Sequence, residues 1–262
     1  MTGEPTAIVT GAARGIGAAI VHRLVDTGWR VVAVDSCADD PAVPYPLSTR
    51  QQLREVAEAR PGSVMDVAAD VRDLSALVDA VRTGEDRFGP IGAAVGAASV
   101  ITGGKPLWET RTPEWDPMFD VGVHGVANLA RAALPAMLTR PEPRSGRFIA
   151  VASAAGHHGM WHLSGYSAAK HAVVGMVKSL AHDLRGTGVT ATAVSPGATR
   201  TAMLAATARA YGLDSVDAFT PHHLIDRIVE PAEVAAAVVW LCGRDADVVS
   251  GSVIHADGGF LS

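Results

Sequence analysis

Three side chains in the second half of the chain have the types and spacing of a proton-transfer site. Tyr166 and Lys170 stand four residues apart in a segment whose pattern predicts a helix, so both side chains share one helix face. An ammonium beside a phenol stabilises the phenolate and lowers the tyrosine pKa from about 10. Ser153 follows a predicted strand, and its hydroxyl can bond a substrate oxygen as a carbonyl becomes an alkoxide. The pattern predicts acid–base catalysis on an alcohol or ketone.

A glycine-rich turn near the N-terminus, residues 10–17 (TGAARGIG), joins a predicted strand to a predicted helix. Gly11 allows a sharp turn, Gly15 allows close approach to a pyrophosphate, and Gly17 allows the helix to pack closely on the sheet. The first N–H groups of the helix then face the phosphate. The turn therefore predicts a dinucleotide cofactor.

The next strand ends in an acid that selects the cofactor. The carboxylate of Asp35 can accept hydrogen bonds from both ribose hydroxyls and repels a 2′-phosphate, which favours NAD over NADP. Arg14 is the opposing signal, because its guanidinium could reach a 2′-phosphate. Asp70 after the third strand can accept from the adenine amino group while the N–H of Val71 donates to the ring.

Short β-branched runs alternate with longer alanine-rich segments along the whole chain, which predicts one parallel sheet with helices on both faces. Two segments interrupt this alternation. Residues 36–53 contain three prolines that forbid a regular helix, and residues 201–230 form a long excursion of the kind that serves as a substrate lid. Strands are expected at 7–10, 30–34, 63–65, 91–95, 147–151, 189–194 and 252–255, and helices at 15–27, 51–60, 74–88, 113–138, 166–184 and 231–242.

Composition limits the classes of function. With 48% hydrophobic and 19% charged residues, the 262-residue chain predicts a large core in a single domain over residues 1–262. No apolar run reaches the ~18 residues of a membrane helix, and no signal peptide is evident. Two cysteines, Cys37 and Cys242, favour a reducing cytoplasm. No zinc-ligand spacing occurs, so no metal is expected, and a net charge of −5 disfavours nucleic acid.

These motifs together resemble the short-chain dehydrogenase/reductase family. The resemblance is carried by residues 10–17, Asp70-Val71, Ser153, YSAAK at 166–170, Pro196-Gly197 with Thr201, and Asp257-Gly-Gly259. It implies a single-domain α/β Rossmann fold, a doubly wound parallel seven-stranded sheet of order 3-2-1-4-5-6-7, usually in a homotetramer. It also implies that Tyr166 is the general acid/base, Lys170 holds the nicotinamide ribose, Ser153 orients the substrate, and residues 196–201 cradle the carboxamide. The candidate cofactor-binding residues are Gly11, Arg14, Gly15, Ile16, Gly17, Asp35, Asp70, Val71, Ala97, Tyr166, Lys170, Pro196, Gly197, Thr199 and Thr201.

Two positions depart from the family pattern. Ala97-Ala98-Ser99 stands where the family usually has Asn-Ala-Gly, and Gly122 stands where it usually has an active-site asparagine. The missing amide would normally help to hold a water that relays protons to Lys170. We therefore expect slow turnover with free NAD, and a higher steady-state rate when Gly122 is replaced by asparagine.

The proline-rich insertion, followed by STRQQL at 48–53, also resembles the subgroup of the family associated with mycofactocin. That resemblance implies that NAD stays tightly bound, with residues 39–47 as a latch over it, and that mycofactocin accepts the electrons.

The substrate is expected to be a hydrophobic alcohol or ketone. Candidate pocket residues are Trp108, His158, Met160, Trp161 and Tyr211, the last within the lid. A catalytically weak dinucleotide-binding sensor or scaffold is the first alternative, favoured by Gly122 and Ala97. An isomerase or dehydratase is the second, although such proteins usually have a longer C-terminal substrate domain.

Overall fold

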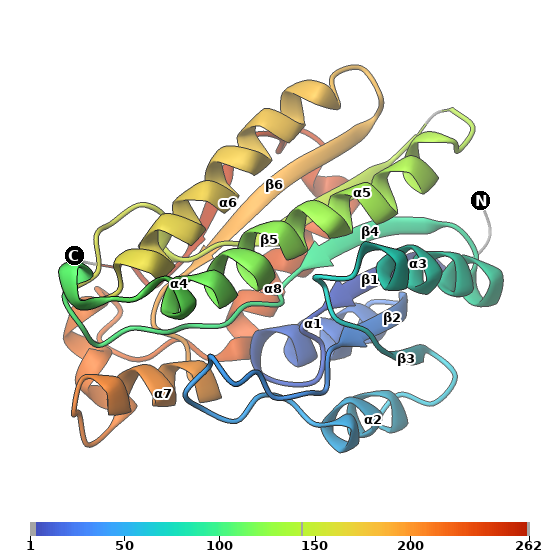
Figure 1. Cartoon of the computed structure of the whole chain (residues 1–262). Helices are drawn as coiled ribbons and strands as arrows, with labels where there is room; N and C mark the ends of the chain where they lie inside the picture. Colours follow the sequence, from blue (N-terminus) through green and yellow to red (C-terminus); the bar gives the residue numbers. More distant parts are fainter. Residues whose placement is uncertain (1–3, 143, 261–262) are drawn as a thin grey trace.

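The computed structural model describes residues 4–142 and 144–260, which contain one seven-stranded parallel sheet (Figure 1). The strand order is β3-β2-β1-β4-β5-β6-β7, so the predicted order is confirmed. The strands are short runs rich in valine, isoleucine and alanine, and the five inner strands are buried on both faces, whereas the edge strands β3 and β7 are partly exposed. They are β1 (Thr6–Thr10), β2 (Arg30–Asp35), β3 (Val64–Ala68), β4 (Ile91–Gly96), β5 (Gly146–Val151), β6 (Val189–Pro196) and β7 (Val253–Ala256).

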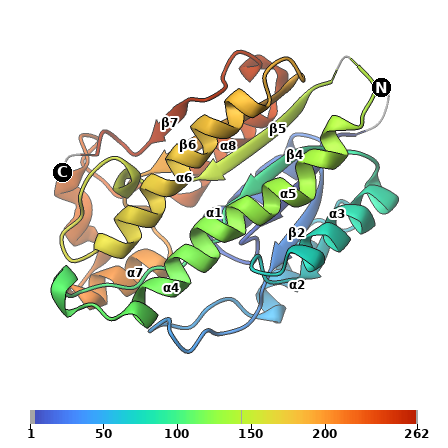
Figure 2. The ribbon, with the colours of Figure 1, turned by 45° about the horizontal axis from the view of Figure 1, so that its top comes forward.

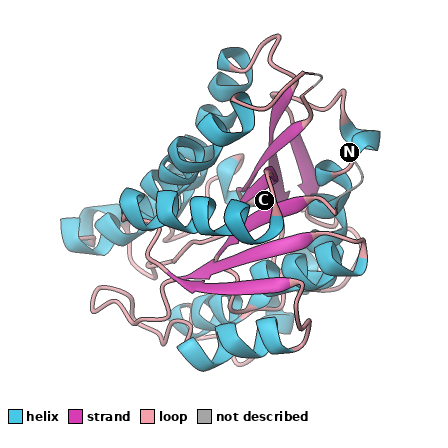
Figure 3. Ribbon diagram, turned by 90° about the vertical axis from the view of Figure 1, so that its right-hand side faces the viewer, coloured by secondary structure: helices cyan, strands magenta, loops and turns pink. Residues whose placement is uncertain are grey.

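Helices cover both faces of the sheet, and each face has its own apolar core (Figures 2 and 3). Phe148, Leu129 and Val173 belong to the core under α3, α5 and α6, whereas Ile20 and Val234 belong to the core under α1 and α8. This arrangement is the predicted doubly wound fold. The helices are α1 (Gly15–Asp26), α2 (Arg50–Glu58), α3 (Leu74–Phe88), α4 (Thr112–Phe119), α5 (Gly125–Leu138), α6 (Ser164–Asp183), α7 (Ala202–Ala210) and α8 (Pro231–Cys242).

Two predicted segments differ in the structure. The helix expected over residues 113–138 is divided into α4 and α5 by a π-helical turn, Asp120–His124, which contains Gly122. π-turns insert an extra residue into a helix and are frequent at functional sites. The excursion at residues 201–230 is not a structureless loop. It contains α7, whose first turn is capped by the Thr201 hydroxyl, and a 3₁₀ segment at Val216–His222.

The insertion between β2 and α2 crosses the carboxyl edge of the sheet. Its residues 36–49, which we call the strap, contain no helix or strand and lie beside α7 (Figures 1 and 2). Val43 and Tyr45 of the strap are buried in a third apolar cluster with Ile101, Leu163 and Ala206 of α7. Four segments that are far apart in sequence, namely the strap, the loop after β4, the start of α6 and α7, therefore meet over the ends of the strands.

Candidate active site

The glycine-rich turn has the conformation that the sequence predicts. Gly11 and Gly15 have φ values of +68° and +57°, a region that side chains other than glycine rarely enter. A Cβ on Gly11 would lie 2.7 Å from the Ala98 nitrogen, and one on Gly17 would overlap the Gly11 carbonyl oxygen. No side chain of the described residues caps the N-terminus of α1. Its free N–H groups and the narrow glycine surface fit a pyrophosphate.

Two adjoining cavities of about 180 and 400 Å³ occupy the carboxyl edge of the sheet. They share Ile16, Ala97, Ser99, Thr201 and Met203, so they form one continuous cleft. Every candidate cofactor-binding residue lines at least one of them. The first cavity is lined by Gly11, Arg14, Gly15, Ile16, Gly17, Asp35, Asp70, Val71 and Ala97. The second is lined by Ser153, Tyr166, Lys170, Pro196, Gly197, Thr199 and Thr201.

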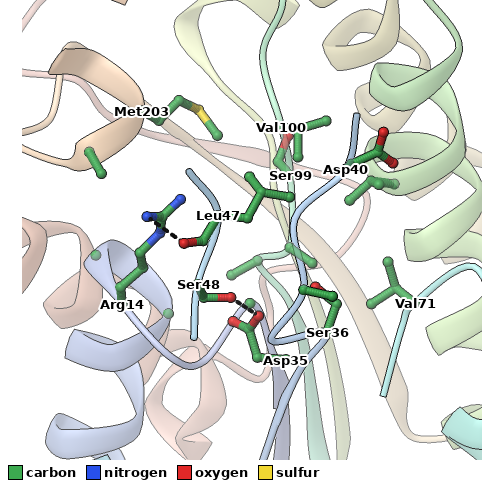
Figure 4. Close-up of a pocket in the computed structure, with 18 of the residues that line it drawn as sticks. Arg14, Asp35, Ser36, Asp40, Leu47, Ser48, Val71, Ser99, Val100 and Met203 are labelled. Atoms are coloured by element: carbon green, nitrogen blue, oxygen red, sulfur yellow. Dashed lines mark hydrogen bonds between the residues drawn. The ribbon is translucent and has the colours of Figure 1, made fainter. Parts of the chain in front are cut away.

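At the first cavity, the strap contacts both residues that sequence reasoning weighed against each other. The Asp35 carboxylate accepts from the Ala13 N–H at 3.0 Å, from the Cys37 N–H at 3.4 Å and from the Ser48 hydroxyl. The Arg14 guanidinium donates to the carbonyl oxygen of Pro46 at 3.0 Å. It also donates to the carbonyl oxygen of Leu47 at 3.3 Å (Figure 4). Ser48 is the first residue of the STRQQL segment at 48–53, but its hydrogen bond to Asp35 was not predicted from the sequence.

Asp70 lies in the first cavity as expected, but its carboxylate is bound by a neighbour that sequence reasoning missed. Arg72 donates to both oxygens of Asp70 and, at 2.8 Å, to Asp40 of the strap. Burial raises the pKa of Asp70, but the hydrogen bonds from Arg72 outweigh this and hold it below its ordinary value. The only signal in the sequence was a basic residue two places after the acid.

Ser153, Tyr166 and Lys170 converge from two elements. Ser153 follows β5 and accepts from the Ala155 N–H at 3.2 Å, while Tyr166 and Lys170 lie in the first two turns of α6. The Lys170 ammonium donates to the Val151 carbonyl oxygen at 2.9 Å and lies 5.7 Å from the centroid of the Tyr166 ring. The side chains therefore have the geometry of a proton-transfer group.

The pKa of the phenol differs from the sequence expectation. Burial raises the pKa of Tyr166 to about 12, and a hydrogen bond with Ser153 opposes this only in part. Burial also lowers the pKa of Lys170 to about 8, because the ammonium loses its hydration inside the protein. Sequence spacing predicts that the two groups are neighbours, but it contains no information on how much water both have lost.

The second cavity has mostly apolar walls, and three of the five candidate pocket residues line it: Met160, Trp161 and Tyr211. Trp108 and His158 do not. Trp108 is 85% exposed in a short 3₁₀ segment, and His158 faces the ring of Phe260 instead. His158 directly precedes the lining residue Gly159, but proximity along a loop does not determine which way a side chain points. Leu204, Thr207 and His222 of the predicted lid segment also line the cavity, as do Ile101 and Phe260, which were not predicted.

The backbone of Gly122 can accept a Cβ without a clash. A Cβ added there would meet only the Ser99 hydroxyl oxygen, at 3.7 Å, an ordinary contact distance. Position 122 of the π-turn could therefore carry a side chain, but the residue there is glycine.

Within residues 4–142 and 144–260, no helix is long and apolar enough to cross a membrane. The same residues contain no group of three histidine, cysteine or acidic side chains arranged to hold a metal.

Comparison with known proteins gives consistent matches over the whole length. The family model described as enoyl-(acyl carrier protein) reductase matches residues 11–261. The (−)-trans-carveol dehydrogenase of Rhodococcus erythropolis is 32% identical over 97% of this chain and 96% of its own. The crystal structure of carveol dehydrogenase from Mycobacterium avium in complex with NAD has a TM-score of 0.91, with 29% identity over 98% of each chain. A short chain dehydrogenase from Mycobacterium paratuberculosis bound to NAD has a TM-score of 0.87, with 28% identity over 97% of each chain.

Proposed function

The chain belongs to the short-chain dehydrogenase/reductase family and is an NAD-dependent oxidoreductase, and we propose that it interconverts a hydrophobic secondary alcohol and its ketone at the second cavity. The observation that carries this proposal is the convergence of Ser153, Tyr166 and Lys170 on one apolar cavity that is continuous with the glycine-rich turn.

Each of the three side chains has a separate role in the proposal. The nicotinamide of bound NAD supplies the two-electron acceptor or donor. The Ser153 hydroxyl orients the substrate oxygen, and the Tyr166 phenol gives a proton to that oxygen or takes one from it. The Lys170 ammonium keeps one N–H on the Val151 carbonyl and has two more for the cofactor ribose and for water. Apolar walls exclude bulk water from the reacting atoms.

Tyr166→Phe tests this assignment. The variant removes the proton donor and leaves the ring, so turnover should fall by about 100-fold or more while NAD binding stays within about twofold of wild type. Turnover is measured with an alcohol panel and NAD binding by calorimetry. A sensor or scaffold, the alternative that Gly122 and Ala97 favour, would keep its ligand response in the variant. Unchanged turnover would contradict the role of the phenol.

We further propose a cyclic alcohol of about ten carbons as the substrate class. A cavity of about 400 Å³ holds a nicotinamide and a small ring system, and aromatic side chains line its outer part. The relatives that act on carveol support the same size. A panel of cyclic and linear secondary alcohols tests this: a preference for linear polar substrates would count against it.

The strap supports a proposal about the cofactor. It lines the first cavity and is anchored by Tyr45 on one side and by the Asp40–Arg72 ion pair on the other. We propose that it keeps NAD bound between turnovers and that mycofactocin, a peptide-derived redox cofactor, accepts the electrons. Mass spectrometry of purified protein after gel filtration should find NAD, and an artificial acceptor should support faster turnover than free NAD. Cofactor-free protein with fast exchange of added NADH would remove the proposal.

We also propose a homotetramer in the cytoplasm. Trp240 of α8 and Val248 are 44% and 93% exposed, and subunit contacts would cover such side chains. Light scattering of the purified protein measures the assembly state directly.

A further inference from the structure

The strap carries a hydroxyl to the position where sequence reasoning places the adenosine ribose. Ser48 Oγ donates a hydrogen bond to Oδ1 of Asp35, and Figure 4 shows the two side chains pointing toward each other at the wall of the first cavity. Both residues are almost completely buried, with 7% and 8% of their surface exposed. Since both residues also line the first cavity, they are placed to meet a ligand.

We propose that Ser48 is a second ribose-binding residue, which accepts a hydrogen bond from a ribose hydroxyl and thereby selects NAD against NADP. The proposal rests on the proposed position of NAD in the first cavity, with its adenosine ribose beside Asp35.

The hydrogen bonds of Asp35 provide the first argument. A carboxylate offers about four acceptor positions. The Ala13 N–H, the Cys37 N–H and the Ser48 hydroxyl occupy three of them. One position remains, whereas the ribose of NAD presents two hydroxyl donors. The second donor needs another acceptor within reach.

Ser48 Oγ is that acceptor. Its proton is directed to the Asp35 carboxylate, so the oxygen presents only lone pairs to the cavity. Among the described residues, no donor forms a hydrogen bond to it. The hydroxyl is also not required to begin α2, because Thr49 caps that helix, accepting from the Gln52 N–H at 3.2 Å. A role toward a ligand therefore explains the position of the hydroxyl better than a role in the helix.

The same contacts exclude a 2′-phosphate. A phosphate oxygen at this place would be repelled by the Asp35 carboxylate, and the Ser48 hydroxyl could donate to the phosphate only by giving up its hydrogen bond to Asp35. The cation that could compensate is held elsewhere, because the Arg14 guanidinium donates to the carbonyl oxygens of Pro46 and Leu47. The strap thus supplies an acceptor and also engages the Arg14 guanidinium.

Equilibrium competition against labelled NAD tests the inference without measuring turnover. The ligands are NAD, 2′-deoxy-NAD, 3′-deoxy-NAD and NADP, and the proteins are wild type, Ser48→Ala and Ser48→Thr. Wild type should bind NAD more tightly than the deoxy analogue that lacks the contacting hydroxyl, by about threefold to tenfold, the range of one hydrogen bond. Ser48→Ala should lose this preference and discriminate less against NADP, and Ser48→Thr should restore both.

Tyr45→Phe is the matched control, because it loosens the strap without touching Asp35. It should change the affinities for NAD and for both deoxy analogues by one common factor. If Ser48→Ala also shifts all three by one factor, or shifts none, Ser48 does not bind the ribose and the inference is overturned. If wild type binds no NAD at all, the proposed position of the cofactor is refuted, and the inference about Ser48 is refuted with it.

Discussion

Tyr45 should control the rate at which NAD leaves the protein. Its ring is 7% exposed and packs against Ile101, Leu163 and Ala206, which belong to the loop after β4, the start of α6 and α7. Its hydroxyl accepts from the Ile101 N–H at 3.1 Å. These contacts fasten the strap over the first cavity, so the strap must detach from them before a retained cofactor can leave.

The size of the effect follows from the buried ring. Replacing a buried aromatic side chain by alanine costs about 3 to 5 kcal/mol. We use the lower end, because the contacts of the strap with Arg14 and Arg72 remain in the variant. A loss of about 3 kcal/mol from the closed state makes opening about 100-fold more frequent, and Tyr45→Ala should release NAD faster by about that factor. Tyr45→Phe leaves the Ile101 N–H without its acceptor, which costs about 1 kcal/mol, and should release NAD about fivefold faster.

The assay is the release of bound NAD into an excess of unlabelled NAD, followed by rapid gel filtration and mass spectrometry. Pro44→Ala is the control, since Pro44 is an exposed strap residue, and it should change the rate by about fivefold at most. Urea unfolding of each variant separates strap opening from general loss of stability. If Tyr45→Ala releases NAD at the wild-type rate, the strap does not gate the cofactor and the reasoning is refuted.

Three further variants test other parts of the site. Gly17→Ala should abolish NAD binding in calorimetry while the protein still folds by circular dichroism, because the new Cβ would overlap the Gly11 carbonyl oxygen and displace the turn from the phosphate. Gly122→Asn should raise the steady-state rate with free NAD, since a Cβ at residue 122 meets no closer atom than the Ser99 hydroxyl oxygen at 3.7 Å; an unchanged or lower rate would show that the amide is not the missing part of the proton relay. Comparison of wild type with Lys170→Met should show how the buried lysine makes the free energy of unfolding depend on pH. Below pH 8 Lys170 is protonated in both folded and unfolded chains, whereas between its folded pKa of about 8 and its ordinary value of 10.5 the folded protein has lost the proton that the unfolded chain keeps. The free energy of unfolding of wild type, measured by urea denaturation, should therefore rise relative to the variant by about 3 kcal/mol between these pH values, and a constant difference would contradict the shifted pKa.

The sequence by itself determined the fold and most of the residues around the cleft. Alternating β-branched and alanine-rich segments predicted the strands closely; α3 and α8 have the predicted bounds. The spacing of apolar residues within one segment indicates which of its positions are buried, so it can be read without knowledge of the rest of the fold. The glycine-rich turn, Asp35, Ser153, Tyr166 and Lys170 were identifiable because each needs a particular residue type at a fixed distance from a strand end or a helix start. The carboxyl ends of parallel strands lie along one edge of the sheet, so residues that follow different strands come close together in space.

The tertiary structure alone decided what each side chain faces. Nothing local to residues 36–49 showed that Tyr45 would be buried against α7, that Ser48 would donate to Asp35, or that Arg14 would be held by strap carbonyls. The same is true of Trp108 and His158, which do not line the cavity: Trp108 is exposed, and His158 packs against the ring of Phe260. The pKa values of Tyr166 and Lys170 also depended on desolvation by segments distant in sequence. Contacts between loops depend on how separate elements pack together, and no periodicity or spacing along one segment encodes that packing.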